Sequence, residues 1–163
     1  MDLIWEGLKQ AVWLLLTGDR EVLGITGLSL RISLTATAIS LVLGVPAGTA
    51  LGLCRFPGRR LVIALVNTGM AMPPVVVGLV VSLALWRSGP LGFLEILYTP
   101  TAMIVAQVCL AAPIVMGLTL AAVQQLNPML RLQLLGLGAS RVQVTLLLLR
   151  EARLPLLAAV MAG

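Results

Sequence analysis

Long uncharged apolar runs, separated by short polar segments, dominate the pattern of the chain. Three of these runs exceed the roughly 20 residues that a helix needs to cross the hydrocarbon core of a membrane. They occupy 32–53, 61–85 and 101–123, and with their flanking residues they predict membrane helices over 22–54, 61–85 and 100–123. Because apolar and polar positions do not alternate within the runs, they predict helices and not the strands of a transmembrane barrel. We therefore expect an all-α, polytopic membrane protein.

Prolines interrupt each of the three predicted helices. Pro46 lies between two glycines, where we expect a kink or a close contact with another helix. Pro73 and Pro74 lie near the middle of the second helix and must bend or break it, and Pro113 interrupts the third. Transport proteins tolerate such breaks where they line a cavity or are covered by neighbouring helices.

Both ends of the chain contain shorter apolar segments. Apolar residues recur at helical spacing through 1–17, which predicts an interfacial helix with Trp5 and Trp13 at the depth of the lipid headgroups. Residues 154–163 read as the start of a further membrane helix that is too short to cross a bilayer. We therefore expect the chain to be truncated at its C-terminus.

The net charge of +5 is distributed unevenly, and its placement predicts orientation in membrane lipid and not binding to nucleic acid. The segment 55–60 contains three arginines and no acid, and 124–153 contains four arginines against one glutamate. Acidic residues outnumber basic ones before residue 22, and Arg87 is balanced by Glu95. The positive-inside rule then makes both basic segments cytoplasmic and places the N-terminus outside.

Several kinds of chemistry are excluded by what the sequence lacks. It has no His, no charged residue within the three runs, and no Gly-rich loop with a lysine that could hold a nucleotide. An ion-coupled carrier would need ionisable groups within the membrane, and a membrane-embedded enzyme would need an acid–base or nucleophilic pair. The sequence therefore favours a conduit whose energy comes from elsewhere, with no cofactor or metal in this chain.

The polar segment 124–153 contains the start of a short helix. Asn127 has the position of an N-cap, and Pro128 follows at the first helical position, where its missing N–H costs nothing. The helix should run to about Leu137, and Gly136 lies near its C-terminal end.

A compact corner should follow this helix. Gly138 suits a residue with positive φ, and Ser140 stands three residues before Gln143 in the arrangement of a capping box. A second helix should start at Arg141, leaving Ala139 exposed at the bend. Taken alone, this corner could be either a connector or a docking element.

The sequence through this corner resembles the cytoplasmic "EAA" loop of ABC importer permeases. In that family the loop forms a coupling helix that docks on the ATP-binding subunit. The glutamate of the family motif is replaced by Leu132 and its first alanine by Gln133. The resemblance implies that the coupling residues are Leu132, Gln133, Gly136, Gly138, Ala139, Ser140 and Arg141.

The segments 28–37, 55–60, 67–70, 73–78 and 88–92 are similar to the tungstate branch of oxyanion permeases. This resemblance implies the type I ABC importer permease fold and uptake of an oxyanion, tungstate first, with molybdate or sulfate as alternatives. It also implies a homodimer, an ATP-binding subunit that holds ATP and Mg, and an extracytoplasmic binding protein. The expected location is the cell membrane of a bacterium or archaeon.

The candidate translocation pathway lies at the predicted break of the second helix, at Asn67, Thr68, Gly69, Pro73 and Pro74. Asn67 and Thr68 could offer uncharged donors to a passing oxyanion. Two alternatives stay open: a purely structural kink with Asn67 bonded to a neighbouring helix, and a membrane scaffold that recruits a partner without transporting.

Overall fold

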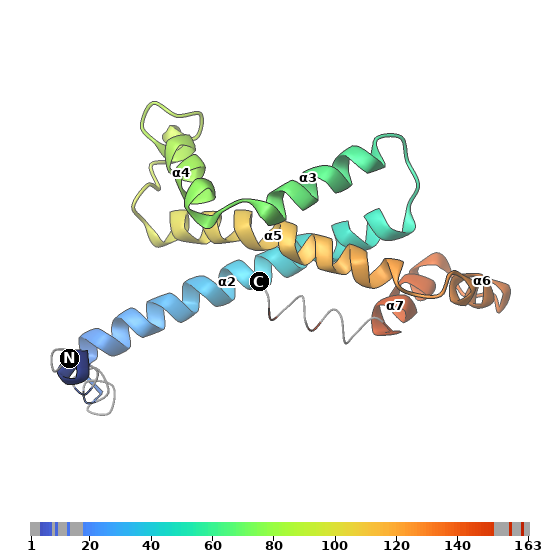
Figure 1. The fold of residues 1–163 in the computed structure, drawn as a ribbon, viewed down its shortest axis with the longest axis horizontal. Coiled ribbons are helices and arrows are strands. Elements are labelled where there is room, and N and C mark those ends of the chain that lie inside the picture. The colour runs from blue at the N-terminus through green and yellow to red at the C-terminus, as the bar shows by residue number, and fades with distance from the viewer. Residues whose placement is uncertain are drawn as a thin grey trace.

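The computed structural model describes residues 4–7, 9, 13, 18–151, 157 and 161, with backbone alone at Pro128, Arg131 and Arg141. Helices account for all of the regular structure in this described part, which confirms the all-α class (Figure 1). They are α2 (Arg20–Leu53), α3 (Arg59–Ala71), α4 (Pro74–Leu85), the 3₁₀ helix η1 (Gly92–Leu94), α5 (Pro100–Gln124), α6 (Pro128–Gly136) and α7 (Arg141–Glu151).

Helix α2 runs along most of the molecule and packs along α5 (Figure 1). Its 34 residues span about 51 Å at 1.5 Å per residue. The helix begins at an N-cap, where Asp19 Oδ1 accepts the backbone N–H groups of Glu21 and Val22 at 2.9 and 3.3 Å. The predicted membrane helix over 22–54 is therefore the greater part of one continuous helix.

Glycines on α2 bring it into close contact with α5. A Cβ atom at Gly44 would lie 2.8 Å from Val115 Cγ1, and one at Gly48 would lie 2.5 Å from the backbone oxygen of Met116. Gly52, four residues further, is equally close to α5. Small residues at this spacing let two membrane helices approach closely. The close contact expected around Pro46 is confirmed.

The second predicted membrane helix is broken into α3 and α4, whose axes differ by 105°. Met72 and Pro73 adopt extended conformations between the two helices. Two causes act together: neither Pro73 nor Pro74 has an N–H to donate, and a residue before proline avoids the helical region. The expected break at Pro73 and Pro74 is confirmed, and the segment predicted over 61–85 consists of two helices.

Helix α5 continues through Pro113 without a break, so the expected interruption is wrong. Its N-cap is Thr99, whose Oγ1 accepts the N–H of Ala102 at 3.4 Å. On the side facing α3, a Cβ atom at Gly69 would lie 3.0 Å from Pro113 Cβ. The proline ring thus packs at the contact between α5 and α3. A proline is tolerated within a membrane helix where a neighbouring helix covers it.

The two basic segments lie at the same end of the molecule. In Figure 1 the loop between α2 and α3 and the helix α6 are both on the right, opposite the N-terminus. Within that loop, Gly58 has φ +85°, and Arg59 Nε donates to the backbone oxygen of Leu51 at 2.7 Å. This hydrogen bond satisfies a carbonyl in the last turn of α2. The shared end agrees with the charge pattern, and the orientation itself stays a prediction.

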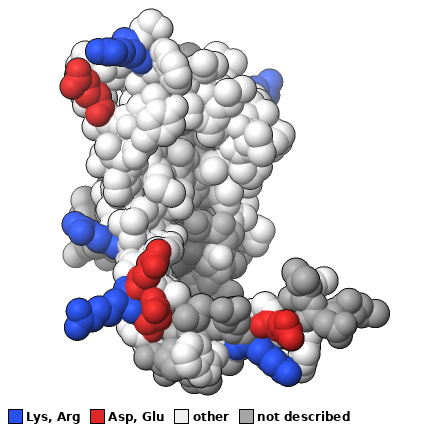
Figure 2. All heavy atoms as spheres, turned by 90° about the vertical axis from the view of Figure 1, so that its left-hand side faces the viewer, with Lys and Arg blue, Asp and Glu red and all other residues white. Residues whose placement is uncertain are grey.

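Most of the apolar surface of the long helices faces outward. In the most apolar window of both α2 and α5, 22% of the residues are buried within the chain. Figure 2 shows a broad uncharged surface between a charged group at the top of this face and others lower down. Among the residues that the structure describes, two helices are long and apolar enough to cross a membrane, and α3 with α4 makes a third if the bent pair counts as one span. The chain is a multi-pass membrane protein.

The ends of the chain are described only in part. The described residues 4–7, 9 and 13 are helical, and Lys9 Nζ lies 5.4 Å from the centre of the Trp5 ring. The predicted interfacial position of this helix stays a prediction. The membrane helix expected to start in 154–163 lies outside the described residues except at 157 and 161.

Candidate functional site

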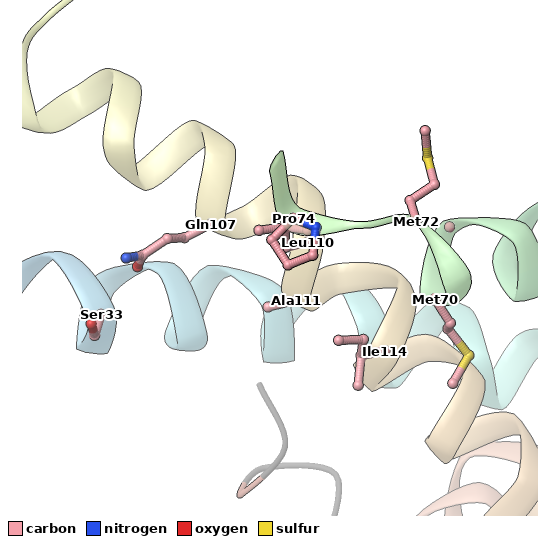
Figure 3. A pocket seen from close by; sticks show the side chains of 9 residues that line it. Ser33, Met70, Met72, Pro74, Gln107, Leu110, Ala111 and Ile114 are labelled. Carbon is pink, nitrogen blue, oxygen red and sulfur yellow. The ribbon is translucent and has the colours of Figure 1, made fainter. Parts of the chain in front are cut away.

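A cavity of about 460 Å³ lies where α3 ends and α4 begins (Figure 3). Its walls come from four helices: Ser33 on α2, Gly69 and Met70 on α3, Pro74 on α4, and Gln107 on α5. Met72 and three apolar residues of α5 complete the lining. The cavity is therefore built by the break in the second predicted membrane helix.

Methionine and glycine shape the floor of this cavity. Figure 3 shows the side chains of Met70 and Met72 pointing to opposite sides of the chain, with Met70 directed towards α5. A Cβ atom at Gly117 of α5 would overlap the sulfur of Met70. Gly117 thus leaves room for the methionine, and Gly69 leaves room for the ring of Pro113. The two contacts hold the end of α3 against α5.

The predicted pathway residues divide into two groups. Gly69 and Pro74 line the cavity, whereas Asn67, Thr68 and Pro73 are exposed and lie outside its lining. Thr68 Oγ1 donates back to the oxygen of Ala64 at 2.9 Å, so its hydrogen is already used within α3. A contact of Asn67 or Thr68 with a solute stays a prediction.

Sequence reasoning missed the two polar side chains that line the cavity, Ser33 and Gln107. A signal for Gln107 was present, because it is the one amide side chain within the otherwise apolar run 101–123. Its relation to Ser33 depends on how α2 packs along α5, which the pattern of either helix does not reveal. Both groups are uncharged donors that can bind a polar solute without adding a fixed charge.

The other candidate site is the corner between α6 and α7, where Gly138 follows the end of α6. Gly138 has φ +83°. Its N–H donates to the backbone oxygen of Leu135 at 3.0 Å, and the N–H of Ala139 donates to the backbone oxygen of Leu134 at 3.1 Å. These two bonds form a Schellman motif, which satisfies carbonyls left free at the end of α6. The positive φ expected at Gly138 is confirmed.

The next helix starts with the capping box that the sequence predicts. The backbone N–H of Ser140 donates to Gln143 Oε1 at 2.8 Å, and the N–H of Gln143 donates to Ser140 Oγ at 3.3 Å. Asn127 caps α6 in a similar way, accepting the N–H of Met129 at 2.9 Å. The corner is thus defined by local hydrogen bonds at both helix starts.

The predicted coupling residues are mostly exposed. This holds for Leu132, Gln133, Gly136, Gly138 and Ser140. Ala139 is half-buried, so its expected exposure is wrong: the hydrogen bond of its N–H turns it back against α6. The backbone of Arg141 begins α7, and its side chain lies outside the described part.

Apolar side chains without a covering surface surround these residues. Met129 and Leu132 on α6 are 61% and 62% exposed, and Leu137 at the corner is 84% exposed. On α7, Val142 and Leu146 also face outward. These exposed apolar side chains lie at the end of the molecule that also contains the arginine-rich segments. Exposed apolar groups among polar residues are typical of a protein–protein contact.

The inner face of α7 is anchored. Val144 and Leu148, one turn apart, are 3% and 2% exposed. A groove of about 650 Å³ lies between the last turns of α2 and the α6–α7 corner, with Pro46 on one wall and Leu149 on the other. The corner is therefore exposed on one face and close to α2 on the other.

Comparisons with known proteins agree with these features. The model of the family of binding-protein-dependent transport system inner membrane components matches residues 44–162. A "Probable anion ABC transporter permease protein" of Haloferax volcanii is 43% identical over 142 residues, which is 87% of this chain and 61% of that protein. The "Tungstate uptake system permease protein TupB" of Peptoclostridium acidaminophilum is 41% identical over 155 residues, 94% of this chain and 67% of that protein.

A more distant relative extends the range of named substrates. The "Sulfate transport system permease protein CysW" of Escherichia coli is 31% identical over 103 residues, 60% of this chain and 35% of that protein. The chain thus spans about three fifths of the length of the Haloferax protein and about two thirds of TupB.

Proposed function

The chain belongs to the family of binding-protein-dependent transport system inner membrane components, and we propose that it is the permease subunit of an ATP-driven importer of an oxyanion, most specifically tungstate. As a permease it is a translocation component and not a catalyst. The observation that carries the proposal is the pairing of an uncharged cavity at a broken membrane helix with an exposed helical corner at one end of the molecule.

The choice of tungstate follows from the relatives and suits the cavity. TupB, at 41% identity, is named for tungstate uptake, and the Haloferax relative is named for anions. None of the described residues that line the cavity is charged, so a dianion can be contacted there without being held too tightly by a fixed cation in surroundings of low dielectric constant. Molybdate and sulfate, which share the tetrahedral shape, are the alternative substrates.

The partners follow from the two ends of the molecule. An ATP-binding subunit, which holds ATP and Mg, docks on the corner around Gly138, where Leu132 and Leu137 expose apolar surface. An extracytoplasmic binding protein delivers the oxyanion at the opposite end. A second copy of the permease covers part of the outward-facing apolar surface and completes one pathway in the type I importer arrangement.

Energy from ATP reaches the cavity through packed helices in this proposal. When the ATP-binding subunits close, they displace the α6–α7 corner. The buried face of α7, at Val144 and Leu148, transmits this displacement to the membrane helices. The close packing of α2 and α5 makes them move together, while the extended residues Met72 and Pro73 allow α4 to move separately. The nucleotide thereby biases two states of the cavity, open to one side or the other.

Orientation completes the proposal. The loop at Arg55, Arg59 and Arg60 and the α6–α7 corner lie on the cytoplasmic side, and the N-terminus lies outside. The membrane is the cell membrane of a bacterium or archaeon. A scaffold that recruits a partner without transporting would need the corner but not the cavity.

Binding-protein-stimulated ATPase activity tests the proposal. The permease is purified in complex with its ATP-binding subunit, reconstituted in liposomes, and mixed with the binding protein either empty or loaded with tungstate. We expect ATP turnover to rise with the loaded binding protein. A complex whose turnover does not respond to the binding protein would support the scaffold and contradict the importer.

A further inference from the structure

Gln107 lies half-buried in the wall of the cavity, about two turns into the apolar helix α5. Figure 3 shows its side chain extending from α5 over α2, the helix that contributes Ser33. Among the described residues, the remaining lining consists of glycine and apolar side chains. In this part of the chain, the carboxamide of Gln107 and the hydroxyl of Ser33 are therefore the polar side chains that a solute in the cavity meets.

Both groups have hydrogens available. Within the described part of the chain, neither the Gln107 carboxamide nor the Ser33 hydroxyl makes a hydrogen bond. Two threonines of α2 behave differently: Thr35 and Thr49 donate to backbone oxygens one turn back, at 2.6 and 2.7 Å. Ser40 of α2 and Thr119 of α5 also have no hydrogen-bond partner in the described part, but both are buried between helices and neither lines the cavity. A polar side chain in a membrane helix ordinarily bonds its own backbone or a neighbouring helix. Gln107 departs from that pattern at the place where a cavity opens.

We infer that Gln107 is a substrate contact of the pathway, and that its carboxamide N–H groups donate to the passing oxyanion while the Ser33 hydroxyl donates from α2. The inference rests on the proposed function. The oxygens of an oxyanion accept hydrogen bonds, and an amide N–H or a hydroxyl supplies them without a fixed charge. The N-terminal end of α4 also lies at the cavity, since Pro74 lines it, and its dipole favours an anion there.

A structural role makes a different prediction. If Gln107 served only to pack α5 against α2, the Leu and Glu variants that assemble would transport alike, because uptake is measured per assembled complex. If Gln107 contacts an anion, Glu is the worse replacement, because its charge repels the solute. The order of the two variants therefore separates the roles.

The experiment measures tungstate uptake by the reconstituted transporter complex, per assembled complex, at a tungstate concentration below saturation. Parent protein is compared with Gln107→Leu and Gln107→Glu, and Ser82→Leu on the exposed face of α4 is the matched control. We expect Gln107→Leu to lower uptake about tenfold, from the loss of hydrogen bonds to a charged group. Gln107→Glu should lower uptake further at neutral pH and recover in part as the pH falls, because protonation removes the charge. Ser82→Leu should match the parent.

The outcomes bear on different claims. If the parent transports tungstate and Gln107→Glu is at least as active as Gln107→Leu at neutral pH, Gln107 is structural and the inference is overturned. Activity of Gln107→Glu that does not change with pH overturns it as well, even if Gln107→Leu fails to assemble. If the parent complex takes up no oxyanion, the proposed function fails first.

Discussion

The backbone oxygen of Met116 lies 2.5 Å from the position that a Cβ atom at Gly48 would occupy. A real Cβ atom cannot approach an oxygen so closely, so only glycine allows α2 to sit against α5 at this point. The neighbouring contacts of Gly44 and Gly52 repeat this requirement one turn away on each side. The position of α2 against α5, and with it the cavity wall at Ser33 and Gln107, depends on these glycines.

Gly48→Ala should separate α2 from α5 and lower the stability of the purified complex. Forcing a methyl group into a packed interior costs about 1–3 kcal/mol. Gly24→Ala on the same helix is the matched control, because a Cβ atom at Gly24 meets nothing within 4 Å. The midpoint of thermal unfolding in detergent should fall for Gly48→Ala and not for Gly24→Ala. Equal midpoints for the two variants would show that the close contact does not limit stability.

Thr119→Val should leave stability unchanged or raise it. Thr119 is fully buried, and its Oγ1 has no hydrogen-bond partner in the described part of the chain. Replacing an unsatisfied buried hydroxyl by a methyl group of the same shape removes a desolvation cost of about 1–3 kcal/mol. The same thermal measurement checks this. A lower unfolding midpoint would mean that the hydroxyl is bonded in the assembled protein.

The elements that the sequence predicted well are local. The caps at Asn127 and Ser140 and the positive φ of Gly138 each depend on residues within one or two turns, and each appears as expected. The limits of α5 also match, because a long uncharged run is bounded by Thr99 and the polar segment after Gln124. These features need no knowledge of the tertiary packing.

The features that the sequence did not predict depend on contacts between distant segments. Pro113 leaves α5 unbroken, with its ring packed against Gly69 of another helix. Ser33 and Gln107 are 74 positions apart in the sequence and line the same cavity only because α2 packs along α5. Neither relationship can be read from the period of a single helix.

Gly138→Arg should uncouple ATP hydrolysis from transport while the membrane helices remain folded. The φ of +83° disfavours any residue with a side chain, and the bulk of Arg would also block close approach of the ATP-binding subunit. Gly138→Asn separates the two effects, because Asn tolerates positive φ better and is smaller. ATPase activity of the reconstituted complex is the measurement. If Gly138→Arg kept the full stimulated turnover, the docking surface would have to lie elsewhere.

Pro73→Ala should impair transport more than it impairs expression. Alanine restores an N–H at position 73 and favours continuation of α3, which alters the extended segment at Met72 that forms one side of the cavity. Pro57→Ala, in the exposed loop before α3, is the control. We expect uptake per folded complex to fall for Pro73→Ala alone. Unchanged uptake by Pro73→Ala would show that the break between α3 and α4 is not part of the translocation pathway.

Oxyanion uptake by the reconstituted complex tests the central claim most directly. Liposomes containing the permease, its ATP-binding subunit and internal ATP are supplied with binding protein and labelled tungstate at submicromolar concentration, with molybdate or sulfate as competitors. We predict ATP-dependent accumulation of tungstate that resists an equal concentration of either competitor. Competition by equal molybdate would widen the substrate to both anions. Failure to accumulate tungstate, molybdate or sulfate would contradict the assignment as an oxyanion importer.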